Sequence, residues 1–207
     1  MRPILCLVAL VFTLAACSTK PVVYDDEAFV RSVSYRDPGP ASITLYTIIN
    51  NRSGSGAHTA LLINASERVI FDPAGSFFMD AVPEQHDVLF GITRNIEFYY
   101  RSAHARSTFH VLMQTIEVTP EQAEMAYRLA RANGPVGDAY CAQSTSSILS
   151  RIPGFESIKV TMFPNNLARQ FAALPGVEEF RYYEEDDPDL QKALQENNAR
   201  LNAAQKG

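Results

Sequence analysis

Several stretches of the chain alternate apolar with polar positions, or gather β-branched and aromatic residues, and such stretches are typical of β-strands. They are residues 43–49, 58–63, 68–72, 96–101, 107–118 and 160–163. The second and third are separated only by the polar turn at 64–67, which predicts a β-hairpin. The pattern therefore favours a sheet of neighbouring antiparallel strands.

Helices are expected mainly in the second half of the chain. Thr119-Pro120 is a typical helix start, and the apolar positions that follow over 123–130 share one helical face. A second helix is expected from Asp138, a candidate N-cap, to about residue 151, and a third over 165–174. These elements predict an α+β fold in which a small antiparallel sheet packs with a few helices.

The N-terminus has the organisation of a secretory signal. Met1-Arg2 precede a short apolar run, which is too short to span a bilayer as a permanent helix, and Leu-Ala-Ala-Cys follows at 14–17. This motif resembles the lipobox of bacterial lipoproteins, which implies cleavage before Cys17 and attachment of lipid to its thiol. Ser18 in the next position favours the outer membrane, with the protein facing the periplasm.

The expected organisation follows from this signal and from composition. We expect a lipoprotein signal peptide at 1–16, a lipidated tether at 17–40, a globular domain at 41–180 and a polar C-terminal tail at 181–207. The tail is rich in Gln, Asn and Ala and is expected to be a loose surface helix or disordered. Nothing in the sequence indicates an oligomeric state.

Charge and motif content exclude several classes of function. The chain has 207 residues, 18 basic and 23 acidic, and loss of residues 1–16 removes only Arg2, which changes the net charge from −5 to −6. No basic patch is interleaved with aromatic residues, so nucleic acid is not an expected partner. Motif spacings of metal sites, phosphate-binding loops and Gly-x-Ser-x-Gly serine hydrolases are absent, so neither a metal nor a cofactor is expected.

Cys141 is the one cysteine expected to keep a free thiol, because Cys6 leaves with the signal and Cys17 carries the lipid. Its predicted place in the first turn of a helix favours the reactive thiolate, since free amides and the helix dipole stabilise an anion there. A free cysteine in an oxidising compartment is buried and inert, linked to another chain, or retained for its chemistry. Cys141 is therefore the candidate nucleophile.

A cysteine nucleophile requires a base and a group that holds the base. His58 begins the first strand of the predicted hairpin, directly after a flexible loop. If the turn centres on 65–66, His58 lies across from Asp72 or Pro73, where paired side chains are about 5 Å apart. Asp72 would then bind one imidazole nitrogen and leave the other for Cys141, whereas a register slip of one residue would separate them.

Other polar residues remain open for the third position. His86 lies in the loop that leaves the Asp72 end of the hairpin, and Glu97 lies on a neighbouring predicted strand. His110 falls inside a predicted strand and His104 in a predicted surface loop, and both fit the role of base less well than His58.

The chain order of these residues resembles that of the circularly permuted papain-like (NlpC/P60) family, which includes YaeF/YiiX-like lipoproteins and relatives of lecithin:retinol acyltransferase. Residues 56–63 are similar to the histidine strand of the family, and Tyr140-Cys141 to its cysteine element, although many members have asparagine before the cysteine. The resemblance covers about residues 43–174. It implies that the Cys141 amide contributes to an oxyanion hole, with Tyr46 or Gln143 as candidate second donors.

These observations predict an envelope lipoprotein with a cysteine hydrolase or acyltransferase site. Cys141 would attack a carbonyl, His58 would act as base and then acid, and Asp72 would orient the ring. The scissile bond would be an amide or ester of a peptidoglycan peptide or of a lipid. The alternative is a non-catalytic binding or scaffold lipoprotein of the same fold, in which these three side chains are structural.

Overall fold

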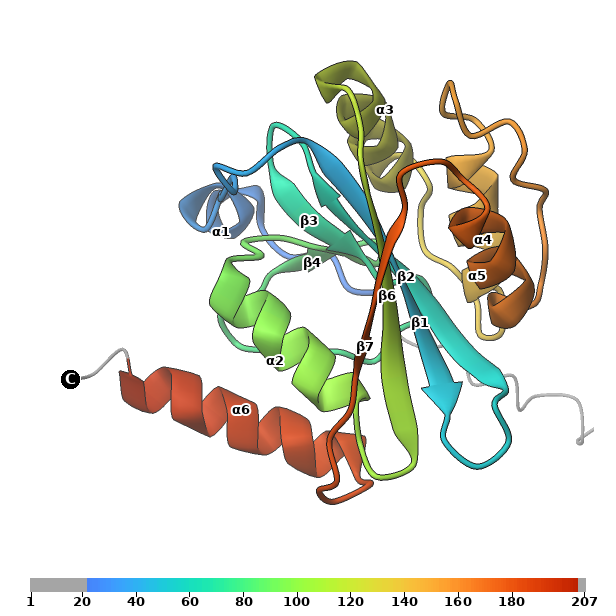
Figure 1. Ribbon diagram of the computed structural model, residues 1–207. Coiled ribbons are helices and arrows are strands. Elements are labelled where there is room, and N and C mark those ends of the chain that lie inside the picture. The colour runs from blue at the N-terminus through green and yellow to red at the C-terminus, as the bar shows by residue number, and fades with distance from the viewer. Residues whose placement is uncertain (1–21, 205–207) are drawn as a thin grey trace, which may run out of the picture.

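The computed structural model describes residues 22–204, which form an open seven-stranded antiparallel sheet with helices on both faces (Figure 1). The strand order is β4-β5-β3-β2-β1-β6-β7. The strands are β1 (Ser42–Asn50), β2 (Gly56–Asn64), β3 (Arg68–Phe71), β4 (Glu84–Gln85), β5 (Val88–Leu89), β6 (Phe109–Glu117) and β7 (Glu178–Tyr182). The predicted α+β class and antiparallel sheet are therefore confirmed, while the predicted signal and Cys17 lie outside the described residues.

Helices cover both faces of the sheet. They are α1 (Glu27–Ser32), α2 (Arg94–His104), α3 (Pro120–Arg131), α4 (Cys141–Leu149), α5 (Pro164–Ala172) and α6 (Leu190–Ala204). In Figure 1, α3, α4 and α5 lie on one side of the sheet, and α2 and α6 lie on the other. Within residues 22–204 no helix is both long and apolar enough to cross a bilayer.

The two faces of the sheet bury separate hydrophobic clusters. On β1, Leu45 joins the cluster under α3, α4 and α5, and its neighbour Tyr46 joins the cluster under α2. On β2, Leu61 likewise joins the cluster under α3, α4 and α5, and Leu62 joins the cluster under α2. Because successive strand residues point to opposite faces, these central strands are buried nearly continuously on both sides. Each fully buried large apolar side chain contributes about 1.5–3 kcal/mol to stability.

The predicted hairpin of β2 and β3 is present, and it fixes where the sheet opens. Leu61 pairs with Phe71, and the described pairing of these strands ends there. On its other side β2 pairs with β1 down to Gly56, with a register shift opposite His58. The first residues of β2 therefore extend past the end of β3, and α4 packs against β2.

The predicted strand at 96–101 is wrong, because this stretch lies within helix α2. Thr93 caps the helix by accepting a hydrogen bond from the Ile96 amide. Ile96, Tyr100 and Ala103 are buried at helical spacing, so one face of α2 packs on the sheet. The run of aromatic residues at 98–100 favours a strand by composition, but the buried face becomes visible only when the pattern is followed as far as Ala103.

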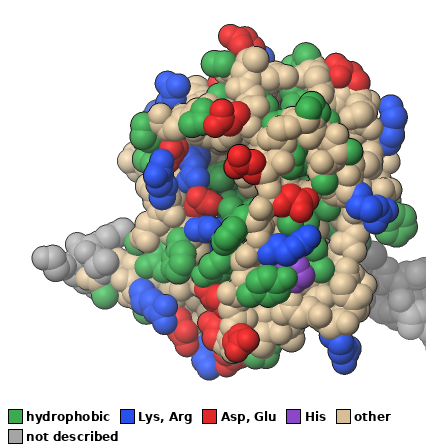
Figure 2. Space-filling model, viewed as in Figure 1, with side chains coloured by type: hydrophobic (Ala, Val, Ile, Leu, Met, Phe, Trp, Pro, Cys, Tyr) green, Lys and Arg blue, Asp and Glu red, His purple; other side chains and the backbone are tan. Residues whose placement is uncertain are grey.

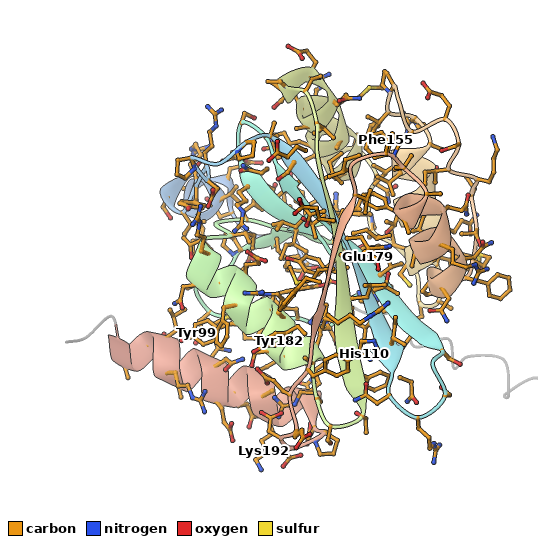
Figure 3. The ribbon with its side chains drawn as sticks, in the orientation of Figure 1. Tyr99, His110, Phe155, Glu179, Tyr182 and Lys192 are labelled. Carbon is orange, nitrogen blue, oxygen red and sulfur yellow. The ribbon has the colours of Figure 1, made fainter. Side chains whose placement is uncertain are left out.

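The predicted strand at 160–163 is also absent, and the sheet instead gains β7, which the sequence did not indicate. β7 pairs with β6 at the edge of the sheet and is almost fully exposed, so it lacks the apolar alternation that marks a strand. Glu179, labelled in Figure 3, accepts a hydrogen bond from the Gln114 side chain of β6. Charged residues on an exposed edge discourage pairing with another chain.

Acidic and basic side chains are interspersed on the face shown in Figure 2.

The predicted polar tail is largely structured, because α6 packs against the domain. Ala193, Leu194 and Leu201 are buried along one side of the helix, and Leu194 and Leu201 belong to the cluster under α2. Asn198 accepts a hydrogen bond from the backbone of Asp80, which ties the helix to a distant loop. The apolar residues are spaced too widely among Gln and Asn for the sequence to reveal this face.

The described part of the predicted tether also folds onto the domain. Asp26 caps α1, and Val30 of that helix is buried in the core. The backbone amide of Asp25 donates to the carbonyl of Glu84, which fastens the segment to β4. The described part of the predicted 17–40 tether thus contains a short helix, which forms through these tertiary contacts.

Candidate active site

Cys141 is the first residue of α4, as its predicted place in the first helical turn requires. The N-cap is Tyr140, whose side chain makes no capping hydrogen bond, so the prediction of Asp138 as the cap is wrong. Ala139 has φ +69°, a left-handed conformation that costs a residue other than glycine on the order of 1 kcal/mol. This turn directs the chain into the helix immediately before the thiol.

One buried residue, Asp87, anchors both sides of the site. Its carboxylate accepts a hydrogen bond of 2.7 Å from the backbone amide of Val136, in the loop that leads to Cys141. Its carbonyl accepts a hydrogen bond of 2.8 Å from the backbone amide of Asp72. Asp87 has φ +65° in the tight turn between β4 and β5, as type I′ hairpin turns require. The loop that leads to Cys141 and the backbone of Asp72 are thus held by the same residue.

His58 and Asp72 form the hydrogen bond that their predicted pairing implies. Nε2 of His58 lies 2.7 Å from Oδ1 of Asp72. The observed register, continued one step past Leu61 and Phe71, would place Asp72 opposite Ala60. A turn centred on 65–66 would place Pro73 opposite His58, whereas the observed register continues to residue 74 there, a shift of one residue. Because Asp72 then falls opposite Ala60, and His58 and Ala60 share a face, the two side chains still meet.

Asp72 is almost completely enclosed, with only 3% of its surface exposed. Besides His58, the hydroxyl of Tyr100 from α2 donates to the same carboxylate oxygen at 2.8 Å. Gly75 lies directly against the carboxylate, since a Cβ at that position would stand 1.8 Å from Oδ2 of Asp72. The carboxylate therefore has one permitted orientation, and in it the carboxylate holds the imidazole ring.

The electrostatics favour a charged imidazole. Burial alone would lower the pKa of His58, but the charge and hydrogen bond of Asp72, with a smaller effect of Cys141, raise it to about 10. Burial would likewise raise the pKa of Asp72, and the charge and hydrogen bond of His58 with the Tyr100 hydroxyl lower it to about 2. At neutral pH the pair is therefore an imidazolium and a carboxylate.

The His58 imidazole lies close enough to the Cys141 thiol to govern its protonation. Burial raises the pKa of Cys141, but the hydrogen bond and charge of His58 outweigh it and lower the pKa below its ordinary value. The backbone of Thr59 and of Ala142 also lowers the pKa of Cys141. A thiolate at a helix N-terminus beside an imidazolium is the arrangement that makes a cysteine nucleophilic.

The other candidates lie elsewhere. His86 occupies the tight turn between β4 and β5 and packs on Tyr24. Glu97 binds Arg68 at 2.6 Å and accepts a hydrogen bond from the Tyr46 hydroxyl at 2.9 Å. Because the Tyr46 hydroxyl is used in this bond, Tyr46 is not the oxyanion donor. Gln143, the other proposed donor, lies exposed on α4.

His110, labelled in Figure 3, lies near the start of β6. Its Nδ1 hydrogen-bonds to the Asn51 side chain at 2.8 Å, and its ring stacks on Tyr183. This histidine therefore has a structural environment of its own, as its place inside a strand suggested.

His104 is not in a surface loop, as predicted, but is the last residue of α2, and 8% of it is exposed. Its ring lies nearly parallel to the His58 ring, with centroids 6.2 Å apart. Together with Tyr100, Asp87 and Gly75 it is a residue of the site that sequence reasoning missed. Tyr100 and His104 are four residues apart on one helix, and assigning 96–101 to a strand hid that relation.

A cavity of about 300 Å³ opens beside the His58 ring. It is lined by the start of β2, the 74–76 loop, the end of α2 and the first residues of α6. Cys141 is not among the residues that line it. The cavity therefore gives access to the His58 side of the site.

No group of three or more His, Cys, Asp or Glu side chains within residues 22–204 is arranged to hold a metal ion. Cys141, His58 and Asp72 provide a thiol, an imidazole and a carboxylate, the groups that nucleophilic catalysis uses. Comparisons with family models, with curated proteins and with solved structures found no match to this chain.

Proposed function

We propose that this protein is a cysteine hydrolase or acyltransferase that acts on an amide or ester bond. The observation that carries the proposal is the 2.7 Å hydrogen bond between the His58 ring and the Asp72 carboxylate, beside a Cys141 thiol whose pKa the same ring lowers. These groups provide a nucleophile, a proton carrier and an orienting anion in contact with one another. The raised pKa of His58 and the lowered pKa of Cys141 agree with an ion pair that is ready to react.

In the first step the Cys141 thiolate attacks the substrate carbonyl carbon. A C–S bond forms, and the carbonyl π pair moves to oxygen. The backbone amide of Cys141 at the start of α4 is placed to donate to this oxyanion, as N-terminal helical amides have no partner within their helix. When the tetrahedral intermediate collapses, His58 gives its proton to the leaving amine or alcohol, and a thioester on Cys141 remains.

In the second step water or an acceptor molecule attacks the thioester. Neutral His58 takes the proton of the incoming nucleophile, the C–S bond breaks, and the thiolate and imidazolium are restored. Asp72 stabilises the charge on the ring and keeps Nε2 occupied, so that the other ring nitrogen faces Cys141. The choice between hydrolysis and transfer depends on which nucleophile enters.

The chain order of histidine strand, aspartate after the next strand and cysteine helix supports a circularly permuted papain-like architecture. One strand of an antiparallel pair carries the base, its partner directly follows the other strand, and the nucleophile comes from a helix packed beside β2. A substrate from the bacterial envelope, a peptidoglycan peptide or a lipid, fits the expected location.

Acylation by activated esters tests this function directly. The purified protein is incubated with p-nitrophenyl esters of different chain lengths, and intact mass is recorded over time. We expect one acyl group to appear on Cys141 and then to be released, and we expect no adduct in Cys141→Ala and slow acylation in His58→Gln. His110→Gln, which changes a histidine outside the site, serves as the control. A wild-type protein that is never acylated at Cys141 would contradict the proposal.

We also propose that the protein is anchored in the bacterial envelope through lipid on Cys17, at the outer membrane and facing the periplasm. The support is the signal sequence and the Leu-Ala-Ala-Cys motif. Metabolic labelling with a fatty acid analogue should mark the wild-type protein and not Cys17→Ala. Labelling of both, or of neither, would contradict the anchor.

A second function, a non-catalytic envelope binding protein of the same fold, is favoured by one observation. Cys141 is 6% exposed, which is low for a nucleophile that must reach a substrate. In that case the thiol packs as a small hydrophobe, and the acylation experiment gives no adduct at Cys141 while the protein remains folded.

A further inference from the structure

The cavity beside His58 has a mainly apolar wall. Its apolar lining comes from residues far apart in the sequence: Ile48, Ala57, Ala74, Ala103, Phe109 and Leu190. Its volume of about 300 Å³ is at the lower end of the range for small-molecule sites. Leu190 begins α6, so the C-terminal segment forms part of this wall.

The one arginine in the lining is already neutralised, as His58 is by Asp72. Arg106 is 5% exposed, its Nη1 lies 3.1 Å from the Asp186 carboxylate, and its Nε donates to the carbonyl of Asp187 at 2.5 Å. Glu184 approaches the same guanidinium at 3.9 Å. An anionic group in the cavity would therefore compete with existing partners, and an uncharged occupant is favoured.

His104 brings one unused hydrogen-bond acceptor to this apolar cavity. Its Nδ1 lies 2.7 Å from the backbone carbonyl of Tyr100, and because a carbonyl can only accept, Nδ1 carries the proton. Nε2 is then an acceptor in the neutral ring, and no hydrogen bond joins it to any group within residues 22–204. Burial lowers the pKa of His104 and outweighs the opposing effect of the Asp72 carboxylate, so the ring stays neutral.

The chemistry of the proposed reaction says which part of a substrate lies here. The acyl carbon bonds to Cys141, while the departing atom receives its proton from His58 and must lie within hydrogen-bond reach of that ring. The cavity touches His58 and not Cys141. A group in it is therefore on the leaving-group side of the scissile bond.

We propose that this cavity is the leaving-group subsite, and that Nε2 of His104 accepts a hydrogen bond from the N–H of an uncharged, apolar amine portion of an amide substrate. This inference rests on the proposed function. An ester has no hydrogen on its leaving atom, so His104 favours amides over esters. On cleavage the C–N bond breaks, His58 gives its proton to the nitrogen, and the amine keeps its own hydrogen bonded to His104.

Three chloromethyl probes test the subsite by their rates of alkylation of Cys141 in the full-length protein. 2-Chloro-N-phenylacetamide carries an apolar group and an N–H, and 1-chloro-3-phenylpropan-2-one replaces that N–H by CH₂. Chloroacetamide lacks the apolar group. Each rate is divided by the rate of the same probe with free cysteine, and alkylation is followed on the peptide that contains Cys141.

In the wild type we expect the anilide to exceed the ketone by about tenfold after this correction, which is the contribution of about one hydrogen bond. His104→Phe, which keeps an aromatic ring and removes the acceptor, should reduce the ratio to about one. His104→Gln, whose side-chain oxygen can accept, should restore part of it. Leu190→Trp, which narrows the cavity, should slow both phenyl probes relative to chloroacetamide.

Two results separate the possible failures. If chloroacetamide alkylates Cys141 rapidly but the anilide-to-ketone ratio is near one, or is equal in the wild type and His104→Phe, the subsite is overturned and the proposed function stands. If Cys141 is inert to all three probes in a folded protein, the proposed function fails and the subsite fails with it.

Discussion

Replacing Asp72 by asparagine removes one charge from the site and keeps its shape. The asparagine oxygen can still accept from the Tyr100 hydroxyl and from the His58 ring, so packing is preserved while the ion pair is lost. If the pair stabilises the fold as its pKa shifts imply, Asp72→Asn must cost stability in a pH window that those shifts define.

The pKa of Asp72 is lowered from 3.8 to about 2, and at about 1.4 kcal/mol per unit this corresponds to about 2 kcal/mol. Because the folded pKa is depressed, this contribution is complete above about pH 4 and is lost as the pH falls through 2. The pKa of His58 is raised to about 10, so the contribution is complete below pH 6.5 and is lost as the pH rises through 10. The two pKa shifts describe the same ion pair, so their free energies are not added. The smaller shift, that of Asp72, sets the estimate of the stabilisation.

Urea unfolding followed by circular dichroism measures this difference. At pH 5 the wild type should exceed Asp72→Asn by about 2 kcal/mol in free energy of unfolding, and about half of that difference should be gone at pH 3. The control is Asp138→Asn, which removes an exposed carboxylate from the loop before Cys141. It should change the free energy of unfolding little at either pH. A difference near zero at pH 5, or one that does not shrink at pH 3, would refute the reasoning.

Three further changes test other contacts. Gly75→Ala puts a methyl group 1.8 Å from the Asp72 carboxylate and should cost about 1–3 kcal/mol in urea unfolding, whereas Gly137→Ala, whose nearest contact is 3.8 Å away, should cost much less; equal effects would contradict the close approach. Tyr100→Phe removes the second hydrogen bond of Asp72 and should destabilise the protein by about 1 kcal/mol. NMR titration should then show a raised Asp72 pKa, whereas the control Tyr46→Phe, whose hydroxyl binds Glu97, should leave the Asp72 pKa unchanged. Leu194→Ala should cost about 2–4 kcal/mol in urea unfolding if α6 packs as described, while exposed Gln195→Ala should not; a neutral Leu194→Ala would mean that α6 adds nothing.

Much of the sheet could be predicted because its central strands are strongly patterned. β1, β2, β3 and β6 carry long β-branched or apolar runs, and the hairpin turn sets the partner of β2. The edge strand β7 could not be predicted, since an exposed edge has no buried face to leave a period in the sequence. Residues 96–101 were misassigned because aromatic residues suit a strand, while tertiary packing placed them on a helix.

The candidate site likewise contains some residues that the sequence predicts and others that it does not. Cys141, His58 and Asp72 were found because each lies at the start or end of a recognisable element, and elements bring their ends together. Tyr100, His104 and Gly75 act on that group through contacts between distant segments, and no local pattern marks such contacts. The hairpin register was nearly right, and the observed shift preserved the shared face on which the pairing depends.

The most direct test of a Cys141–His58 pair is the rate of Cys141 alkylation by iodoacetamide as a function of pH, in the wild type and in His58→Ala. The wild-type thiol should titrate below about 8.5, the ordinary value, because the imidazolium stabilises the thiolate. Without His58 burial remains, so the pKa of Cys141 should rise and the thiol should react slowly at neutral pH. A wild-type thiol that titrates at or above 8.5, or a titration unchanged by His58→Ala, would contradict the account.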